Sequence, residues 1–125
     1  MFTRYLITIL PAGEALPCPV AAAALARREL PGHTVYIETL DEPGSVTSDH
    51  ALQIEHNNPD RLTITEGYPI PNGDGGLPHS GIYNQLIIDT AAGDVRLHND
   101  TFGLLACYFA QDGGTLRVSN SLRLL

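Results

Sequence analysis

The stretch YNQLIIDTAAGDVRLHNDTFGLLACYFAQDGGTLRVSNSLRLL, residues Tyr83–Leu125, is the part of the chain that decides the fold. It contains short runs of β-branched, aromatic and leucine residues, separated by turns rich in glycine and aspartate. This pattern is typical of antiparallel strands joined by tight turns. We therefore expect four strands in a meander, at Ile82–Asp89, Val95–His98, Leu104–Ala110 and Leu116–Ser119. The last five residues, from Ser121, are expected to begin a helix.

The N-terminal part of the chain predicts one strand and one helix. Arg4–Leu10 (RYLITIL) is almost continuously apolar and ends before Pro11-Ala12-Gly13, which indicates a central strand followed by a turn. Cys18–Leu30 contains four consecutive alanines among other residues that favour helices, and Pro31-Gly32 follows it as a stop signal. We expect this segment to be the one clear helix, packed against a sheet.

The middle of the chain predicts further strands and a long loop. Thr34–Leu40 is rich in β-formers, whereas Ala51–Glu55 and Arg61–Glu66 show alternating polarity and are separated by the turn sequence HNNPD. These last two runs predict a hairpin. Tyr68–Gly81 (YPIPNGDGGLPHSG) holds so many prolines and glycines that we expect a loop, a candidate ligand-binding segment.

Composition predicts one globular domain spanning residues 1–125, and the predicted elements place it in the α+β class, dominated by antiparallel strands with few helices. The 14 acidic and 7 basic residues give a net charge of −7, which disfavours nucleic acid and anionic membranes as partners. Two distant cysteines and no long apolar run favour a cytoplasmic, soluble protein. No cofactor or metal is expected, because the five histidines occur singly in turns or at strand ends.

The pattern from Tyr83 onward resembles the N-terminal glutaminase-like domain of asparagine-synthetase-type proteins. The parts that carry the resemblance are Ile87-Ile88-Asp89, Asp100-Thr101-Phe102-Gly103, Tyr108-Phe109, Asp112-Gly113-Gly114-Thr115-Leu116 and the ending from Ser119 to Leu125. Together they cover about a third of the chain. The resemblance implies a truncated Ntn-hydrolase-like fold, in which antiparallel sheets and helices are stacked in layers. In the family this domain releases ammonia from glutamine for an ATP-dependent domain that follows it.

The residues that would make such a domain a glutaminase are missing. Working relatives expose a cysteine at position 2 whose own α-amine assists the thiolate, and here residue 2 is Phe2. The family's Arg-Gly-Pro substrate loop is absent, as is the Ser-Gly-Gly-x-Asp-Ser pyrophosphate loop of the synthetase domain. We therefore expect no catalytic residue in this chain.

A remnant of the glutaminase pocket is the remaining site that the resemblance implies. The family's Asn-Gly-Glu-Ile-Tyr-Asn motif, which supplies an oxyanion hole, has partial echoes at Asn72-Gly73-Asp74 and at Gly81-Ile82-Tyr83-Asn84. Its distance from the Asp-x-Phe-Gly loop favours Asn72 and Gly73 over Asn84. The candidate pocket residues are thus Asn72, Gly73 and Asp100, with a plain loop turn as the competing interpretation.

Three functional interpretations follow. The leading one is a non-catalytic structural or regulatory module for a synthetase that forms amides or lactams (asparagine synthetase, β-lactam synthetase or lasso-peptide cyclase type). Its partner would be a synthetase-type domain in cis or in trans, and a homo-oligomer stays open. The second is a small hydrolase or amidotransferase with another nucleophile, such as Cys18 or Thr3, whereas Cys107 fits core packing. The third is a β-rich ligand-binding module that uses the Tyr68–Gly81 loop.

Overall fold

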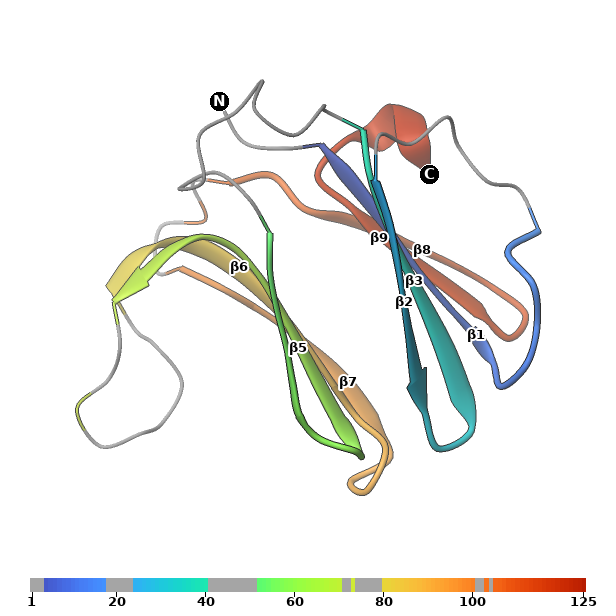
Figure 1. The fold of residues 1–125 in the computed structure, drawn as a ribbon. Coiled ribbons are helices and arrows are strands. Elements are labelled where there is room, and N and C mark those ends of the chain that lie inside the picture. Colours follow the sequence, from blue (N-terminus) through green and yellow to red (C-terminus); the bar gives the residue numbers. More distant parts are fainter. Residues whose placement is uncertain are drawn as a thin grey trace.

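The computed structural model describes residues 4–17, 24–40, 52–70, 73, 80–100, 103 and 105–125. Within them, nine strands form two antiparallel sheets (Figure 1). The five-stranded sheet contains β1 (Tyr5–Pro11), β2 (Ala24–Leu30), β3 (His33–Thr39), β8 (Tyr108–Asp112) and β9 (Thr115–Ser119). The four-stranded sheet contains β4 (Gln53–Asn58), β5 (Arg61–Ile70), β6 (Ser80–Asp89) and β7 (Asp94–Asn99).

Strand β1 lies in the middle of the five-stranded sheet, whose order is β2-β3-β1-β9-β8. Ile7 of β1 is paired with Ile37 of β3 on one side and with Val118 of β9 on the other. All residues from Tyr5 to Leu10 are buried, so both faces of this strand are covered. A strand covered on both faces has no need of polar alternation, which explains its apolar sequence and confirms the predicted central strand.

The four-stranded sheet follows the chain order β4-β5-β6-β7. The hairpin predicted across the HNNPD turn is confirmed, because β4 and β5 pair with Ile54 opposite Ile64. Strand β5 continues to Ile70 and β6 starts at Ser80, so the predicted loop is too long at both ends. Gly67 and Gly81 make this extension possible, since both have positive φ and a Cβ on either would overlap a carbonyl oxygen of the paired strand.

The helix predicted at Cys18–Leu30 is wrong for the part of it that is described. Ala24–Leu30 is strand β2, which pairs along its whole length with β3 through the Pro31-Gly32 turn. Its side chains alternate in exposure, with Ala26 packed against the core and Leu30 buried in it. Pairing and burial here override the helix preference of alanine and arginine. Residues 18–23 lie outside the described part of the chain.

The meander predicted for the final third is also wrong. Strands β6 and β7 belong to the four-stranded sheet, whereas β8 and β9 pair with each other at the edge of the five-stranded one (Figure 1). The chain crosses between the sheets after Asn99, and strand β8 starts only at Tyr108. Leu105 and Ala106 were expected in a strand. Their carbonyl oxygens instead accept hydrogen bonds from the Asn84 side chain.

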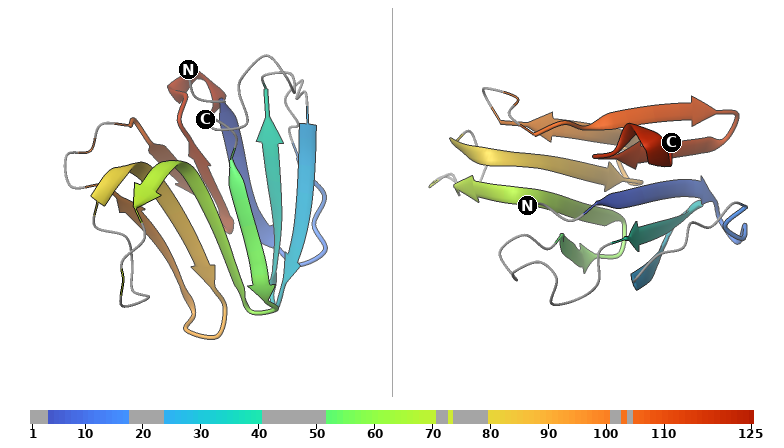
Figure 2. Two further views of the ribbon diagram at one scale, coloured as in Figure 1. Left: turned by 60° about the vertical axis from the view of Figure 1, so that its left-hand side comes forward. Right: turned by 90° about the horizontal axis from the view of Figure 1, so that it is seen from above.

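The described residues are mostly antiparallel β-structure, as expected. The helical share of an α+β fold is not found among them, where the single helical segment is the 3-10 helix η2 (Leu122–Leu124) near the predicted C-terminal helix. Figure 2 shows the strands of both sheets from two further directions. The apolar core is formed by side chains from both sheets. Its buried members are Tyr5, Ile7, Ile9, Leu30, Val35, Ile37, Leu62, Ile64, Leu86, Ile88 and Val118.

Candidate functional site

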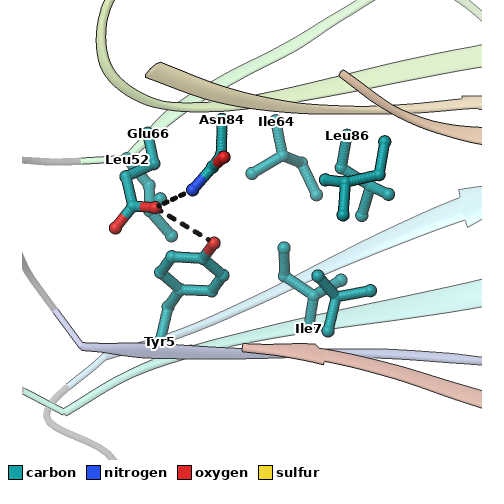
Figure 3. Close-up of a pocket in the computed structure, with 9 residues that line it drawn as sticks. Tyr5, Ile7, Leu52, Ile64, Glu66, Asn84 and Leu86 are labelled. Carbon is teal, nitrogen blue, oxygen red and sulfur yellow. Dashed lines mark hydrogen bonds between the residues drawn. The ribbon is translucent and has the colours of Figure 1, made fainter. Parts of the chain in front are cut away.

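A cluster of polar side chains lies between the two sheets, at one end of the apolar core. Tyr5 of β1 points across the interface toward Glu66 of β5 and Asn84 of β6 (Figure 3). These three side chains are almost completely buried, with exposed fractions of 3–4%. We call Tyr5, Glu66, Asn84, Cys107 and Asn120 the inter-sheet cluster. Buried polar groups require partners, and the cluster supplies most of them.

Glu66 is the acceptor at the centre of the inter-sheet cluster. Its Oε1 accepts hydrogen bonds from the Tyr5 hydroxyl at 3.3 Å and from Asn84 Nδ2 at 3.0 Å. Its Oε2 accepts one from Asn120 Nδ2 at 2.7 Å. The Asn120 Oδ1 in turn accepts the Tyr5 backbone N–H at 3.0 Å. One carboxyl group therefore connects β5 and β6 of one sheet with β1 and the end of β9 of the other.

The orientation of the Asn84 amide follows from its neighbours. Nδ2 faces three acceptors, namely Glu66 Oε1, the Leu105 carbonyl at 3.3 Å and the Ala106 carbonyl at 3.5 Å. Reversing the amide would place its oxygen against these oxygens, so nitrogen must occupy this position. The Oδ1 of Asn84 is then buried with no hydrogen-bond partner among the described residues. We call the part of the chain between β7 and β8, which includes Leu105 and Ala106, the crossing segment. Asn84 thereby fixes the crossing segment to the four-stranded sheet.

The environment of the inter-sheet cluster favours neutral side chains. Burial raises the pKa of Glu66, and the hydrogen bonds from Asn84, Asn120 and Tyr5 offset only part of that rise. Burial also raises the pKa of Tyr5, and the nearby Cys107 and Glu66 raise it further. The Cys107 sulfur lies 3.8 Å from the Tyr5 hydroxyl, and burial raises the pKa of the Cys107 thiol. A thiol in this state is a poor nucleophile.

An open hollow of about 350 Å³ adjoins the inter-sheet cluster. Asn84 and Cys107 line it from the cluster, and its other walls include Leu97, Leu105 and Tyr108. A second void, of about 10 Å³, lies between the sheets beside Tyr5, Glu66 and Asn84 (Figure 3). That volume is about the minimum for one water molecule. The hollow is large enough to take a small organic molecule.

Asp100, one of the predicted pocket residues, is buried, and it binds backbone instead of lining either space. Its N–H donates to the Tyr83 carbonyl at 3.0 Å, and its Oδ1 accepts the Tyr83 N–H at 3.3 Å. The Gly103 N–H donates to the Asp100 carbonyl at 3.1 Å, and Gly103 has a positive φ of 60°. Asp100 is thus fastened to β6 through Tyr83 and to Gly103 through its own carbonyl.

Gly73 is the other predicted pocket residue that the structure describes. Gly73 is exposed and a Cβ on it would meet nothing within 4 Å, as in a plain turn. Asn72, Phe2, Thr3 and Cys18 lie outside the described residues. Asn84, which the spacing argument ranked below Asn72, is the residue that the structure places in a buried polar cluster.

Sequence reasoning missed Glu66, although a signal for it exists. Strand β5 places Leu62, Ile64 and Glu66 on its inward face, so an acid occupies a position where the alternation calls for an apolar residue. Asn84 holds the equivalent position on β6, opposite Glu66, and precedes Leu86 and Ile88 on the same inward face. Such breaks in alternation mark buried polar groups and are visible in sequence.

No group of three His, Cys, Asp or Glu side chains able to hold a metal ion occurs within the described ranges. Nor do these ranges contain a helix whose length and apolar character would let it cross a membrane. The chain matches no model of a known protein family and no curated protein sequence.

Proposed function

We propose that this chain is a non-catalytic glutaminase-like module that supports an ATP-dependent synthetase forming amides or lactams. The partner would be a synthetase-type domain, carried on the same polypeptide or on a separate one, in the cytoplasm. The enzyme class stands open between the asparagine synthetase, β-lactam synthetase and lasso-peptide cyclase types. The proposal extends to the fold, which we take to be a truncated relative of the Ntn-hydrolase arrangement.

The observation that carries the proposal is the position of Asp100. In the segment that resembles the family, this residue begins the Asp-Thr-Phe-Gly sequence. Its two hydrogen bonds to Tyr83 hold it in place directly after β7, the last strand of the four-stranded sheet, before the chain reaches β8 of the other sheet. The Asp100 side chain therefore has a structural role at the place where the chain passes from one sheet to the other. Such a role for the first residue of the Asp-Thr-Phe-Gly sequence supports a fold inherited from the family.

The chemistry of the inter-sheet cluster supports the non-catalytic part of the proposal. A nucleophilic cysteine needs a lowered pKa or an adjacent base. The Cys107 thiol has a raised pKa, and the groups nearest to it are a phenol and a carboxyl whose pKa values are raised as well. At position 2, where working relatives have the nucleophilic cysteine, this sequence has Phe2.

Incubation of the purified protein with glutamine tests this proposal, with glutamate and ammonia as the measured products. We expect no release above that of a sample without protein, and the same result for Cys18→Ala and Cys107→Ala. Turnover by the unaltered protein that either substitution abolishes would establish the hydrolase interpretation instead.

The hollow of about 350 Å³ favours a second candidate, a β-rich ligand-binding module. This hollow differs from the binding segment predicted from sequence, since its walls come from β6, β7, the segment between β7 and β8, and the start of β8. Ala106 is exposed on its wall, so Ala106→Leu would fill it without disturbing the core. The test is to add a small molecule and follow the NMR signals of Leu105–Tyr108. Shift changes that are lost in Ala106→Leu but persist in the control Ala110→Leu would favour this candidate.

A further inference from the structure

Glu66 holds the two sheets together through donors that come from both of them. Tyr5 belongs to β1 and Asn120 directly follows β9, whereas Asn84 belongs to β6 and is paired with Glu66 itself. Each of these three donors is a neutral group. A buried carboxylate without a charged partner loses its hydration and gains no ion pair in return. Ionisation of Glu66 therefore weakens the interface that this residue connects.

The hydrogen bonds of the inter-sheet cluster can accommodate the protonated carboxyl. With Glu66 protonated on Oε1, its O–H donates to the Tyr5 oxygen, and the Tyr5 hydroxyl turns to donate to the Cys107 sulfur. Asn120 still donates to Oε2. With Glu66 ionised, the chain runs the other way, from Cys107 through Tyr5 to Glu66. The Tyr5 hydroxyl has hydrogen-bond partners in both states. Only the ionised state of Glu66 buries a charge.

We propose that Glu66 is a pH-sensitive latch between the two sheets, which holds the interface closed while its carboxyl is protonated and loosens it when the carboxyl ionises. Among the described residues, the titratable groups that face it are Tyr5 of β1 and Cys107, which precedes β8. Strand β6 contributes Asn84 and the residue after β9 is Asn120, neither of which titrates. The latch lies beside the hollow lined by Asn84 and Cys107. This inference goes beyond the proposed function and does not depend on it.

The direction of the pH effect follows from the raised pKa of Glu66. In the unfolded chain this group has the ordinary glutamate pKa of about 4.3. The folded protein binds the proton more tightly, so the stabilisation by the closed latch is fully present below that value. It is lost as the pH rises through the higher pKa of the folded protein.

Urea unfolding of the full chain and of Glu66→Gln, between pH 4.5 and 7.5, tests the latch. Glutamine keeps an acceptor for Tyr5 and Asn84 and cannot ionise. We expect the unfolding equilibrium constant of the unaltered protein to rise severalfold relative to Glu66→Gln as the pH rises. Glu55→Gln serves as the control, because Glu55 is exposed on β4 and its neutralisation leaves the pH dependence unchanged. A ratio that stays constant or falls across this range would overturn the proposal.

Amide hydrogen exchange in the unaltered protein decides the matter if Glu66→Gln does not fold. The Tyr5 N–H, bonded to Asn120 Oδ1, reports on the latch, and the Val35 N–H of the neighbouring strand β3, opposite Ile9, reports on the other end of the β1–β3 pairing. After correction for the intrinsic pH dependence of exchange, we expect the protection of Tyr5 to fall relative to that of Val35 as the pH rises. An unchanged relative protection would overturn the latch.

Discussion

Asp100 and Tyr83 hold each other by two hydrogen bonds across the point where the chain leaves β7. The Asp100 N–H donates to the Tyr83 carbonyl at 3.0 Å, and the Asp100 Oδ1 accepts the Tyr83 N–H at 3.3 Å. Asp100 is 3% exposed and Tyr83 is completely buried, so water cannot replace these bonds. Leaving the Tyr83 N–H without an acceptor would cost the desolvation of a buried donor.

Asp100→Ala is therefore expected to lower the free energy of unfolding by about 1–3 kcal/mol. Urea denaturation measures this change. Asp100→Asn keeps an acceptor oxygen and should retain more of the stability than alanine does. Asp112→Ala, an exposed aspartate on β8, is the control, with an expected change within about 0.5 kcal/mol. Equal effects at positions 100 and 112 would contradict the role given to Asp100.

Gly67→Ala tests the close approach of β5 and β6. Gly67 has a φ of 91°, and a Cβ there would overlap the Ile82 carbonyl oxygen. Gly93 has a φ of 73° with nothing within 4 Å of its Cβ position, so Gly93→Ala isolates the cost of the positive φ. We expect Gly67→Ala to destabilise the protein by at least about 1 kcal/mol more than Gly93→Ala, the cost of an overpacked site. Thermal unfolding of the two variants gives the comparison, and equal losses would count against this strand pairing.

Asn84→Ala tests the connection between the inter-sheet cluster and the crossing segment. The substitution removes one donor from Glu66 and leaves the Leu105 and Ala106 carbonyls without the bonds that Asn84 gives them. We expect a loss of about 1–3 kcal/mol in the free energy of unfolding. Asn99→Ala is a matched control, because Asn99 is paired with Asn84 across β6 and β7 but is exposed. A similar loss in both variants would show that burial of Asn84 is not the cause.

The reactivity of Cys107 checks the raised pKa of its thiol. In a Cys18→Ala background, alkylation by iodoacetamide at pH 7.5 should be at least about tenfold slower in the folded protein than in denaturant. Raising the pH should speed the reaction, since more of the thiol ionises as the pH approaches its raised pKa. A folded-state rate equal to that of the unfolded chain would indicate an activated thiol and reopen the question of catalysis.

The strand-rich part of the fold could be predicted because its signals are local. Arg4–Leu10 is a short apolar run with β-branched residues that ends before Pro11-Ala12-Gly13, and the hairpin around HNNPD carries alternation and turn residues within a few positions of one another. The strand Ala24–Leu30 could not be found in this way, since its partner β3 and its burial, rather than its own composition, determine its structure. The crossing between the sheets was missed for a similar reason. Asn84 binds carbonyl oxygens more than twenty positions away in the sequence.

The candidate site was only partly accessible from the sequence. The Asp-x-Phe-Gly pattern pointed to Asp100 as a pocket residue, whereas in the structure this residue is buried and binds the backbone of Tyr83. Glu66 was missed, because its partners Tyr5, Asn84 and Asn120 come from strands distant in the sequence. The interruption of apolar alternation at Glu66 and Asn84 was available as a signal, but it predicts a buried polar group without naming its partners.

The most direct test of the central claim is the activity of a synthetase with and without this chain. The proposal requires a synthetase with a Ser-Gly-Gly-x-Asp-Ser loop, fused to this chain or encoded beside it, and that enzyme is the one to test. ATP-dependent product formation by that enzyme is measured alone, with the unaltered chain, and with Asp100→Ala. We predict that the unaltered chain binds the synthetase and raises product formation, while Asp100→Ala gives a smaller effect. Product formation that is the same in all three samples, with no binding, would contradict the account.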